Sequence, residues 1–223
     1  MANPAPQFFS IDQPNAFTLL LGPEKQEMLF DPNHLARTSD RFKALLANKL
    51  PEGQARILSL PAISHQAMSI YIQIINCGTF PTIHRFRTGQ VPNRALKNHV
   101  YDKLTTLYFV GQKLDDRTFS NAVIREVLPI FDLYRSAADH GVPGLRTIHI
   151  MYESTPPTVV GRCLLVDMYT NFDSAGQLYS HNAACNPTFL RELAQELLKK
   201  KATEDTAPDS YRLQPLDADD SMI

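Results

Sequence analysis

The sequence has few cysteines and no long apolar run. Its three cysteines, Cys77, Cys163 and Cys185, are scattered along 223 residues and are too few for a disulfide framework. We therefore expect a reducing, intracellular compartment, either cytoplasm or nucleus. No stretch approaches the roughly 20 apolar residues of a membrane span, and residues 1–10 lack the basic and apolar regions of a signal peptide. The sequence thus predicts neither secretion nor membrane insertion.

An excess of charge of either sign is also missing. The 22 basic side chains nearly balance the 23 acidic ones, for a net charge of -1, which provides no overall basic field for nucleic acid. Hydrophobic residues make up 43% and charged residues 20%, values typical of a globular protein with a real core. We expect residues 1–16 to be a flexible N-terminus and residues 202–223 a disordered acidic tail.

Sequence motifs of common enzymes are absent. There is no Walker loop, dinucleotide-binding glycine pattern, Gly-x-Ser-x-Gly elbow or zinc-protease motif. The carboxylates of Asp115 and Asp116 lie at a predicted helix start, where negative charge stabilises the helix dipole, and Glu196 can pair with Lys200. The sequence therefore predicts a protein that is not an enzyme and binds no cofactor.

Metal binding is not predicted either. His181 and Cys185 are four residues apart, a spacing that two metal ligands can use, but no second pair lies nearby. We interpret this segment as a surface loop. Cys163 falls on an apparent apolar stripe, which favours a buried, inert thiol, and the same is expected of Cys77 at a helix end.

Strands and short helices are predicted to come first. Asp31-Pro32 and Thr38-Ser39 are helix starts, because their oxygens can accept hydrogen bonds from unpaired helical amides. Ser64 and Gly78 bracket an apolar helical stripe. The expected order is a hairpin of strands 17–21 and 27–30, two short helices, a third strand at 55–60, and a helix between Ser64 and Gly78.

Helices dominate the prediction after residue 78. A loop at 79–99 precedes helices at 100–114 and 119–131, the second of which Pro129 should kink or end. Ile148, Ile150 and Tyr152 alternate briefly, with the period of a strand. A helix at 160–168 follows. The last helix, ending near residue 201, has Asn186 as its cap and Pro187 at its first position.

This order and its motifs resemble a BTB/POZ domain of the fungal type. The early part is carried by Gly22-Pro23-Glu24, Leu29-Phe30 and the spacing Leu35-x-x-x-Ser39-x-x-Phe42. Later matching segments are Leu58-Ser59-Leu60-Pro61, residues 71–78, residues 103–114, Tyr152-Glu153-Ser154-Thr155-Pro156 and Leu164-Leu165-Val166-Asp167. The resemblance covers about residues 17–200. It implies an α+β fold, with a small, mostly three-stranded sheet flanked by an α-helical cluster and a C-terminal helical extension.

The resemblance also implies domain limits and a function. Residues 17–114 would form the BTB/POZ domain and residues 115–201 the helical extension. The implied function is a protein–protein interaction module that assembles with itself or with other proteins, in one form as an adaptor for a cullin-type ubiquitin ligase. Asp31-Pro32 and Asn76-Cys77-Gly78 depart from the family pattern of His-Lys and Tyr-Thr-Gly. Monomer and dimer both remain open.

A basic segment supplies the candidate partner-binding residues. Residues 79–99 contain Arg85, Arg87, Arg94 and Lys97 and no acidic residue. A solvated loop is one interpretation. A second is an acidic counterpart, either a partner or the acidic tail of this chain. A third, less favoured, is a nucleic-acid-associated transcriptional regulator whose phosphate contacts come from these residues.

Overall fold

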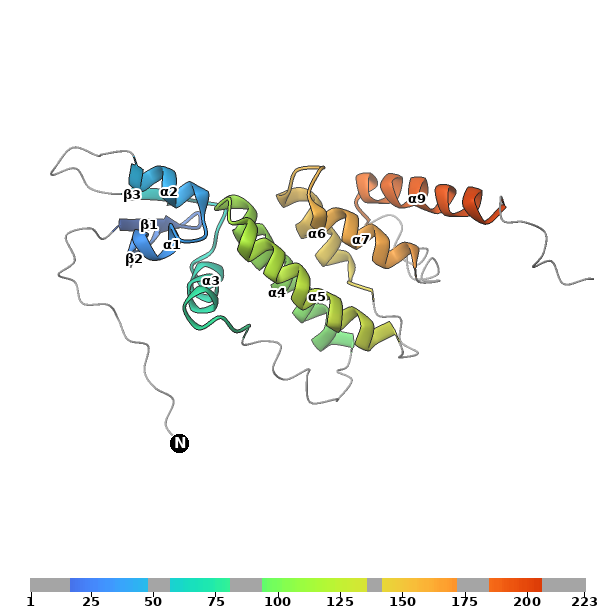
Figure 1. Cartoon of the computed structure of the whole chain (residues 1–223), viewed down its shortest axis with the longest axis horizontal. Helices are drawn as coiled ribbons and strands as arrows, with labels where there is room; N and C mark the ends of the chain where they lie inside the picture. Colours follow the sequence, from blue (N-terminus) through green and yellow to red (C-terminus); the bar gives the residue numbers. More distant parts are fainter. Residues whose placement is uncertain (1–16, 48–56, 81–93, 136–141, 172–184, 206–223) are drawn as a thin grey trace, which may run out of the picture.

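The computed structural model describes residues 17–47, 57–80, 94–135, 142–171 and 185–205. They form an α+β fold in which a three-stranded sheet is followed by a series of helices. In Figure 1 the sheet lies at one end of the molecule with α1 and α2, the α4–α5 pair lies in the middle, and α6, α7 and α9 form the other end. The predicted class, a small sheet with a helical cluster, is confirmed at this coarse level.

The sheet is built on a tight hairpin. Strand β1 (Phe17–Leu21) pairs antiparallel with β2 (Gln26–Phe30), as predicted, and parallel with β3 (Ile57–Leu60), so the strand order is β2-β1-β3. Gly22, with a φ of 70°, opens the connecting turn, in which the Lys25 amide bonds to the Gly22 carbonyl at 3.2 Å. Only glycine adopts this conformation without steric cost.

The inner face of the sheet packs on the two short helices. Alternate β1 residues Phe17, Leu19 and Leu21 are buried, and the ring of Phe30 meets that of Phe42 at 5.1 Å, edge to face. Helix α1 (Pro32–Leu35) starts beside Asp31, whose Oδ1 accepts from the Asn33 amide at 2.9 Å. Helix α2 (Asp40–Ala47) is capped by Ser39, whose Oγ accepts from the Phe42 amide at 3.3 Å.

Helix α3 (His65–Cys77) has the two ends that were predicted. The Ser64 hydroxyl accepts from the Ala67 amide at 3.2 Å. Gly78, with a φ of 66°, closes the helix by donating its amide to the Ile74 carbonyl at 2.7 Å. Tyr71 is fully buried, and its ring lies 4.6 Å from that of Phe119.

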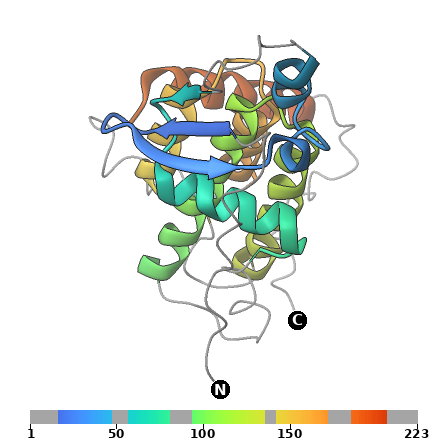
Figure 2. The same ribbon diagram turned by 90° about the vertical axis from the view of Figure 1, so that its left-hand side faces the viewer.

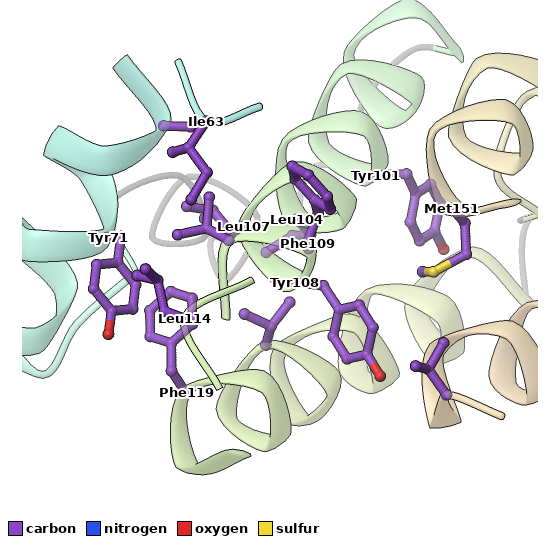
Figure 3. Packing of buried hydrophobic residues seen from close by; sticks show 14 of the residues in the cluster. Ile63, Tyr71, Tyr101, Leu104, Leu107, Tyr108, Phe109, Leu114, Phe119 and Met151 are labelled. Carbon is purple, nitrogen blue, oxygen red and sulfur yellow. The ribbon is translucent and has the colours of Figure 1, made fainter. Parts of the chain in front are cut away.

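Two long helices that lie side by side form the centre of the core (Figure 1). Helix α4 (Arg94–Lys113) starts before residue 100, so the predicted loop at 79–99 is too long at its C-terminal end. Helix α5 (Arg117–Arg135) continues past Pro129, so the helix does not end there. Pro129 is tolerated at an exposed position late in the helix. Figure 3 shows Leu104, Leu107 and Tyr108 of α4 packed among the surrounding elements.

The remaining helices cover the far side of α4. Residues around Ile148 form helix α6 (Leu145–Ser154), so the strand-like alternation was misleading. Ile148, Met151 and Tyr152 are buried at helical spacing, and tertiary packing on α4 selects this period over the local one. Helix α7 (Val160–Thr170) follows.

Helix α9 (Pro187–Asp205) docks on α6 and α7. Asn186 caps it as predicted, because its Oδ1 accepts from the amides of Thr188 at 3.0 Å and Phe189 at 3.3 Å. The fully buried ring of Phe189 lies edge to face with Tyr152 and Tyr169. The helix continues to Asp205, past the boundary predicted at residue 201, so the first residues of the expected tail are helical.

Candidate interaction surface

The outer face of the sheet carries a row of apolar side chains. In the strand register Thr18 of β1 lies opposite Leu29 of β2 and opposite Ile57 of β3, so the three side chains share one face. Leu29 is 58% exposed and Ile57 is 55% exposed, although both belong to a strand. We call Leu29, Thr18, Ile57 and the next residue on this face of β1, Leu20, the outer apolar row.

Both flanking strands of the described sheet pair on one side only. Among the described residues, β2 and β3 each pair with β1 and with no second strand. An extended segment can therefore add to an edge or lie across the outer apolar row. Figure 2 shows β1 and β2 in front of the helical layer, on the side opposite α6, α7 and α9.

Hydrogen bonds attach the start of α2, beside the sheet, to the turn between α4 and α5. The Ser39 hydroxyl donates to the Leu114 carbonyl, the Asp40 amide donates to the Asp115 carbonyl at 3.2 Å, and the Arg41 guanidinium donates to the Lys113 carbonyl at 3.0 Å. The turn before α2 is thus bound to the α4–α5 turn. A surface held in this way is preorganised for a partner, because little conformational freedom is lost on binding.

The predicted acidic pair Asp115-Asp116 belongs to the same turn. Asp116 is fully buried, and its Oδ1 accepts from the Phe119 amide at 2.8 Å, which caps α5 at the helix start where the sequence predicted stabilising negative charge. Its Oδ2 accepts from the Tyr71 hydroxyl at 2.8 Å. Burial, followed by the negative charge of Asp116, raises the pKa of Tyr71 far above its ordinary value. Asp116 therefore links α3 to α5, and its carboxylate is occupied by structural hydrogen bonds.

A cleft lies among α4, α5, α6 and α7. It is a small cleft of about 30 Å³. Its lining is almost wholly apolar: Tyr101, Leu104, Thr105, Tyr108, Val123, Ile124, Val127, Pro143, Thr147, Met151, Gly161, Leu164, Leu165 and Met168. The Tyr108 hydroxyl accepts from the Gly161 amide at 3.1 Å, and the Thr147 hydroxyl donates to Asp102 at 2.7 Å. These polar groups are engaged within the fold, and the cleft holds about the volume of a water or two, less than a ligand pocket.

The basic candidates do not come together as a described site. Arg85 and Arg87 lie outside the described residues, as does the side chain of Arg94, the first residue of α4. Lys97 lies in α4 and is only 3% exposed, so it does not present its ammonium group at the surface. The acidic segment 206–223, the proposed counterpart within the chain, also lies outside the described residues. Partner binding by the three arginines stays a prediction.

The cysteines lie differently from the sequence interpretation. Cys163 and Cys77 are exposed, so the prediction that they are buried is wrong, whereas Cys185 is buried. Cys163 occupies the solvent side of α7, whose buried face carries Leu165, Val166 and Met168. His181, the other half of the considered metal pair, lies outside the described residues. In the described part of the chain, no group of three His, Cys, Asp or Glu side chains is arranged to hold a metal ion.

The sequence interpretation missed a buried arginine. Arg162 is 5% exposed, and its guanidinium donates to the Tyr152 carbonyl at 2.7 Å and to the carbonyl and hydroxyl of Thr155. It also lies 4.4 Å from the centre of the Tyr152 ring, and the Tyr152 hydroxyl donates to Glu192. Burial and then the Glu192 carboxylate raise the pKa of Tyr152. These contacts join α6, α7 and α9.

A signal for Arg162 was present in the sequence. It stands three, four and seven residues before Leu165, Val166 and Tyr169, on the face of α7 that is buried. A cation on an apolar helical face predicts a specific set of acceptors. Here the acceptors are carbonyls at the C-terminal end of α6, where helix carbonyls lack intrahelical partners.

The comparisons with known proteins assign no family to the chain. No protein-family model matches the chain, and no curated protein matches it. None of the helices in the described ranges is long and apolar enough to cross a membrane. The structure defines the class as α+β, with a three-stranded sheet that exposes Leu29 and Ile57 on its outer face.

Proposed function

We propose that the chain is a protein-interaction module of the BTB/POZ type that assembles with itself or with other proteins. The observation that carries this proposal is the outer apolar row, with Leu29 and Ile57 both more than half exposed on a sheet whose flanking strands, among the described residues, each pair on one side only. The order of two strands, two short helices, a third strand and then helices supports it, because the sequence resemblance implies the same order.

The outer apolar row suits a partner on energetic grounds. Fully covering a leucine or isoleucine side chain stabilises a complex by roughly 1.5 to 3 kcal/mol. A small number of such side chains usually contributes most of the binding energy of an interface. The row is rimmed by the polar side chains of Glu27 and Ser59, which lie on the same face beside Leu20. An apolar centre with a polar rim is the usual anatomy of a protein interface.

The adaptor for a cullin-type ubiquitin ligase is one form of this module. In that form the helical extension would bind the substrate, and α9 exposes Leu197 (42%) and Leu198 (68%) for such a contact. All three cysteines are free, which fits a reducing compartment such as cytoplasm or nucleus.

Two direct measurements test the proposal. Light scattering of the purified chain over a range of concentrations should give a mass above one chain, or titration with a purified cullin N-terminal domain should give saturable binding. The double variant Leu29→Asp/Ile57→Asp should weaken whichever association is seen by tenfold or more, since burying an unpaired carboxylate is costly. Val160→Asp, at an equally exposed apolar site at the start of α7, is the matched control and should bind normally. A monomer at every concentration with no cullin binding would contradict the proposal.

A further inference from the structure

The chain enters the sheet next to the outer apolar row. Residues 1–16 lead directly into β1 at Phe17, and the following residue, Thr18, is the one that pairs with both Leu29 and Ile57. Any segment before Phe17 therefore starts one residue from the exposed row. Neighbouring strands are about 5 Å apart, so the row spans only about 10 Å across the sheet.

The composition of residues 1–16 fits that surface. Phe8, Phe9 and Ile11 are large and apolar, and Asp12 is the sole charged side chain of the segment. Residues 12–15 read Asp-Gln-Pro-Asn, rich in types that favour a reversal of the chain. Five residues lie between Ile11 and Phe17, and the six steps from one to the other reach up to about 20 Å, twice the width of the row.

We propose that residues 7–11, Gln-Phe-Phe-Ser-Ile, bind the outer apolar row of their own chain and act as an internal ligand of this surface. The proposal rests on the proposed function, because it takes the row to be the interaction surface. Its consequence is that a partner must displace Phe8, Phe9 and Ile11 before it can use Leu29 and Ile57.

Binding within the chain is favoured over binding to a second copy. A short tether gives the segment an effective concentration in the millimolar range. A second copy at micromolar concentration presents the same segment at about one thousandth of that effective concentration. The comparison requires a linker long enough to bring residues 7–11 onto the row. The reach calculated above satisfies that condition.

The absence of tryptophan from the chain permits a clean test. In Phe9→Trp the only indole sits in the proposed internal ligand. Its fluorescence should be blue-shifted from that of a free indole and independent of protein concentration. Added in this background, Leu29→Thr and Ile57→Thr should each shift the emission to the red and raise iodide quenching, because the open population grows by roughly tenfold, equivalent to about 1.4 kcal/mol. Val160→Thr, at an equally exposed apolar site of α7, is the control and should leave the emission unchanged.

Threonine is chosen because it keeps a high preference for strands, and both replaced side chains are more than half exposed. Unchanged thermal unfolding of each variant checks the fold, and Phe8→Trp is a second reporter in case indole is not accommodated at residue 9. Free-indole emission from both reporters overturns the proposal, and so does a blue shift that disappears on dilution, which indicates a second copy. Failure of the light-scattering and cullin assays while the emission still responds to Ile57→Thr would reject the proposed function and retain the internal contact.

Discussion

The Tyr71 hydroxyl donates a 2.8 Å hydrogen bond to the Asp116 carboxylate, which is fully buried at the start of α5. This contact joins α3 to α5 across 45 residues of sequence, and the same carboxylate caps α5 through the Phe119 amide. The turn that contains Asp116 also holds the turn before α2 through the Asp40 amide. The Asp116 carboxylate therefore links α3 to α5 within the same turn that binds the start of α2.

Asp116→Ala should lower the free energy of unfolding by about 2 to 5 kcal/mol. Loss of a helix cap costs about 1 to 2 kcal/mol, and a buried tyrosine hydroxyl left without its acceptor costs roughly 1 to 3 kcal/mol. Urea unfolding followed by circular dichroism measures the change. Asp132→Ala, at an exposed position of the same helix, is the matched control and should unfold like the unchanged protein. Equal stability of the two variants would show that Asp116 does not have this role.

Alkaline pH should weaken the fold. Burial raises the pKa of Tyr71, Tyr108 and Tyr152, so the folded chain keeps protons that the unfolded chain loses near the ordinary tyrosine value of about 10. Their contribution to stability is complete below that pH and declines as the pH rises above it. Urea unfolding at a series of pH values from 8 to about 11.5 should show the decline. Tyr71→Phe should reduce its slope by up to about 1.4 kcal/mol per pH unit; an unaltered slope would contradict the assignment to Tyr71.

Gly161→Ala should destabilise the packing of α7 on α4. A Cβ at residue 161 would lie 2.8 Å from the Met151 methyl and 2.8 Å from the Tyr108 ring. The Met151 side chain can move, but the Tyr108 ring is held by its hydrogen bond from the Gly161 amide. Overpacking of this kind costs roughly 1 to 3 kcal/mol, partly offset by the better helix propensity of alanine. Thermal unfolding tests this, with the exposed neighbouring change Val160→Ala as the control, for which we expect no loss.

Leu193→Asp should detach α9 from the fold. Leu193 is 6% exposed in α9, which docks on α6 and α7, and the change removes its burial and places a carboxylate in an apolar site. We expect a loss of at least about 3 kcal/mol and a fall in the melting temperature of about 6 °C or more. Leu198→Asp, on the solvent side of the same helix, should melt normally. A melting temperature that is lowered equally by both changes would mean that helix propensity, not docking, is responsible.

Local signals in the sequence predicted the described elements where a cap or a turn is encoded by adjacent residues. Ser64, Gly78 and Asn186 lie at the helix ends where they were expected, because each makes hydrogen bonds within four residues of itself. The same reasoning failed at Ile148, and of the two outcomes expected at Pro129, a kink or an end of the helix, the end did not occur. In α5 the helix continues through the proline, and in α6 contact with α4 imposes a helical period on a short alternating stretch.

The candidate interaction surface could not be predicted from short stretches of sequence, because it depends on how three strands pair. Leu29 and Ile57 look like ordinary strand residues in the sequence, and only the register of three strands shows that both lie on the face away from the core. Equally, the sequence favoured a buried Cys163 and a charged Lys97 at the surface, while the packing places Cys163 in solvent and Lys97 inside.

By itself, the sequence determined the order of strands and helices up to α3, the caps of α2, α3 and α9, and the coarse α+β class, because these follow from spacing and from hydrogen bonds between near neighbours. Tertiary structure alone decided which apolar side chains stay exposed, that Tyr71 meets Asp116, and that Arg162 is buried against the end of α6. Each of those outcomes depends on contacts between residues that are distant in sequence, or on which of the two faces of an element is turned toward the core. Their energies depend on what the rest of the fold places opposite each side chain.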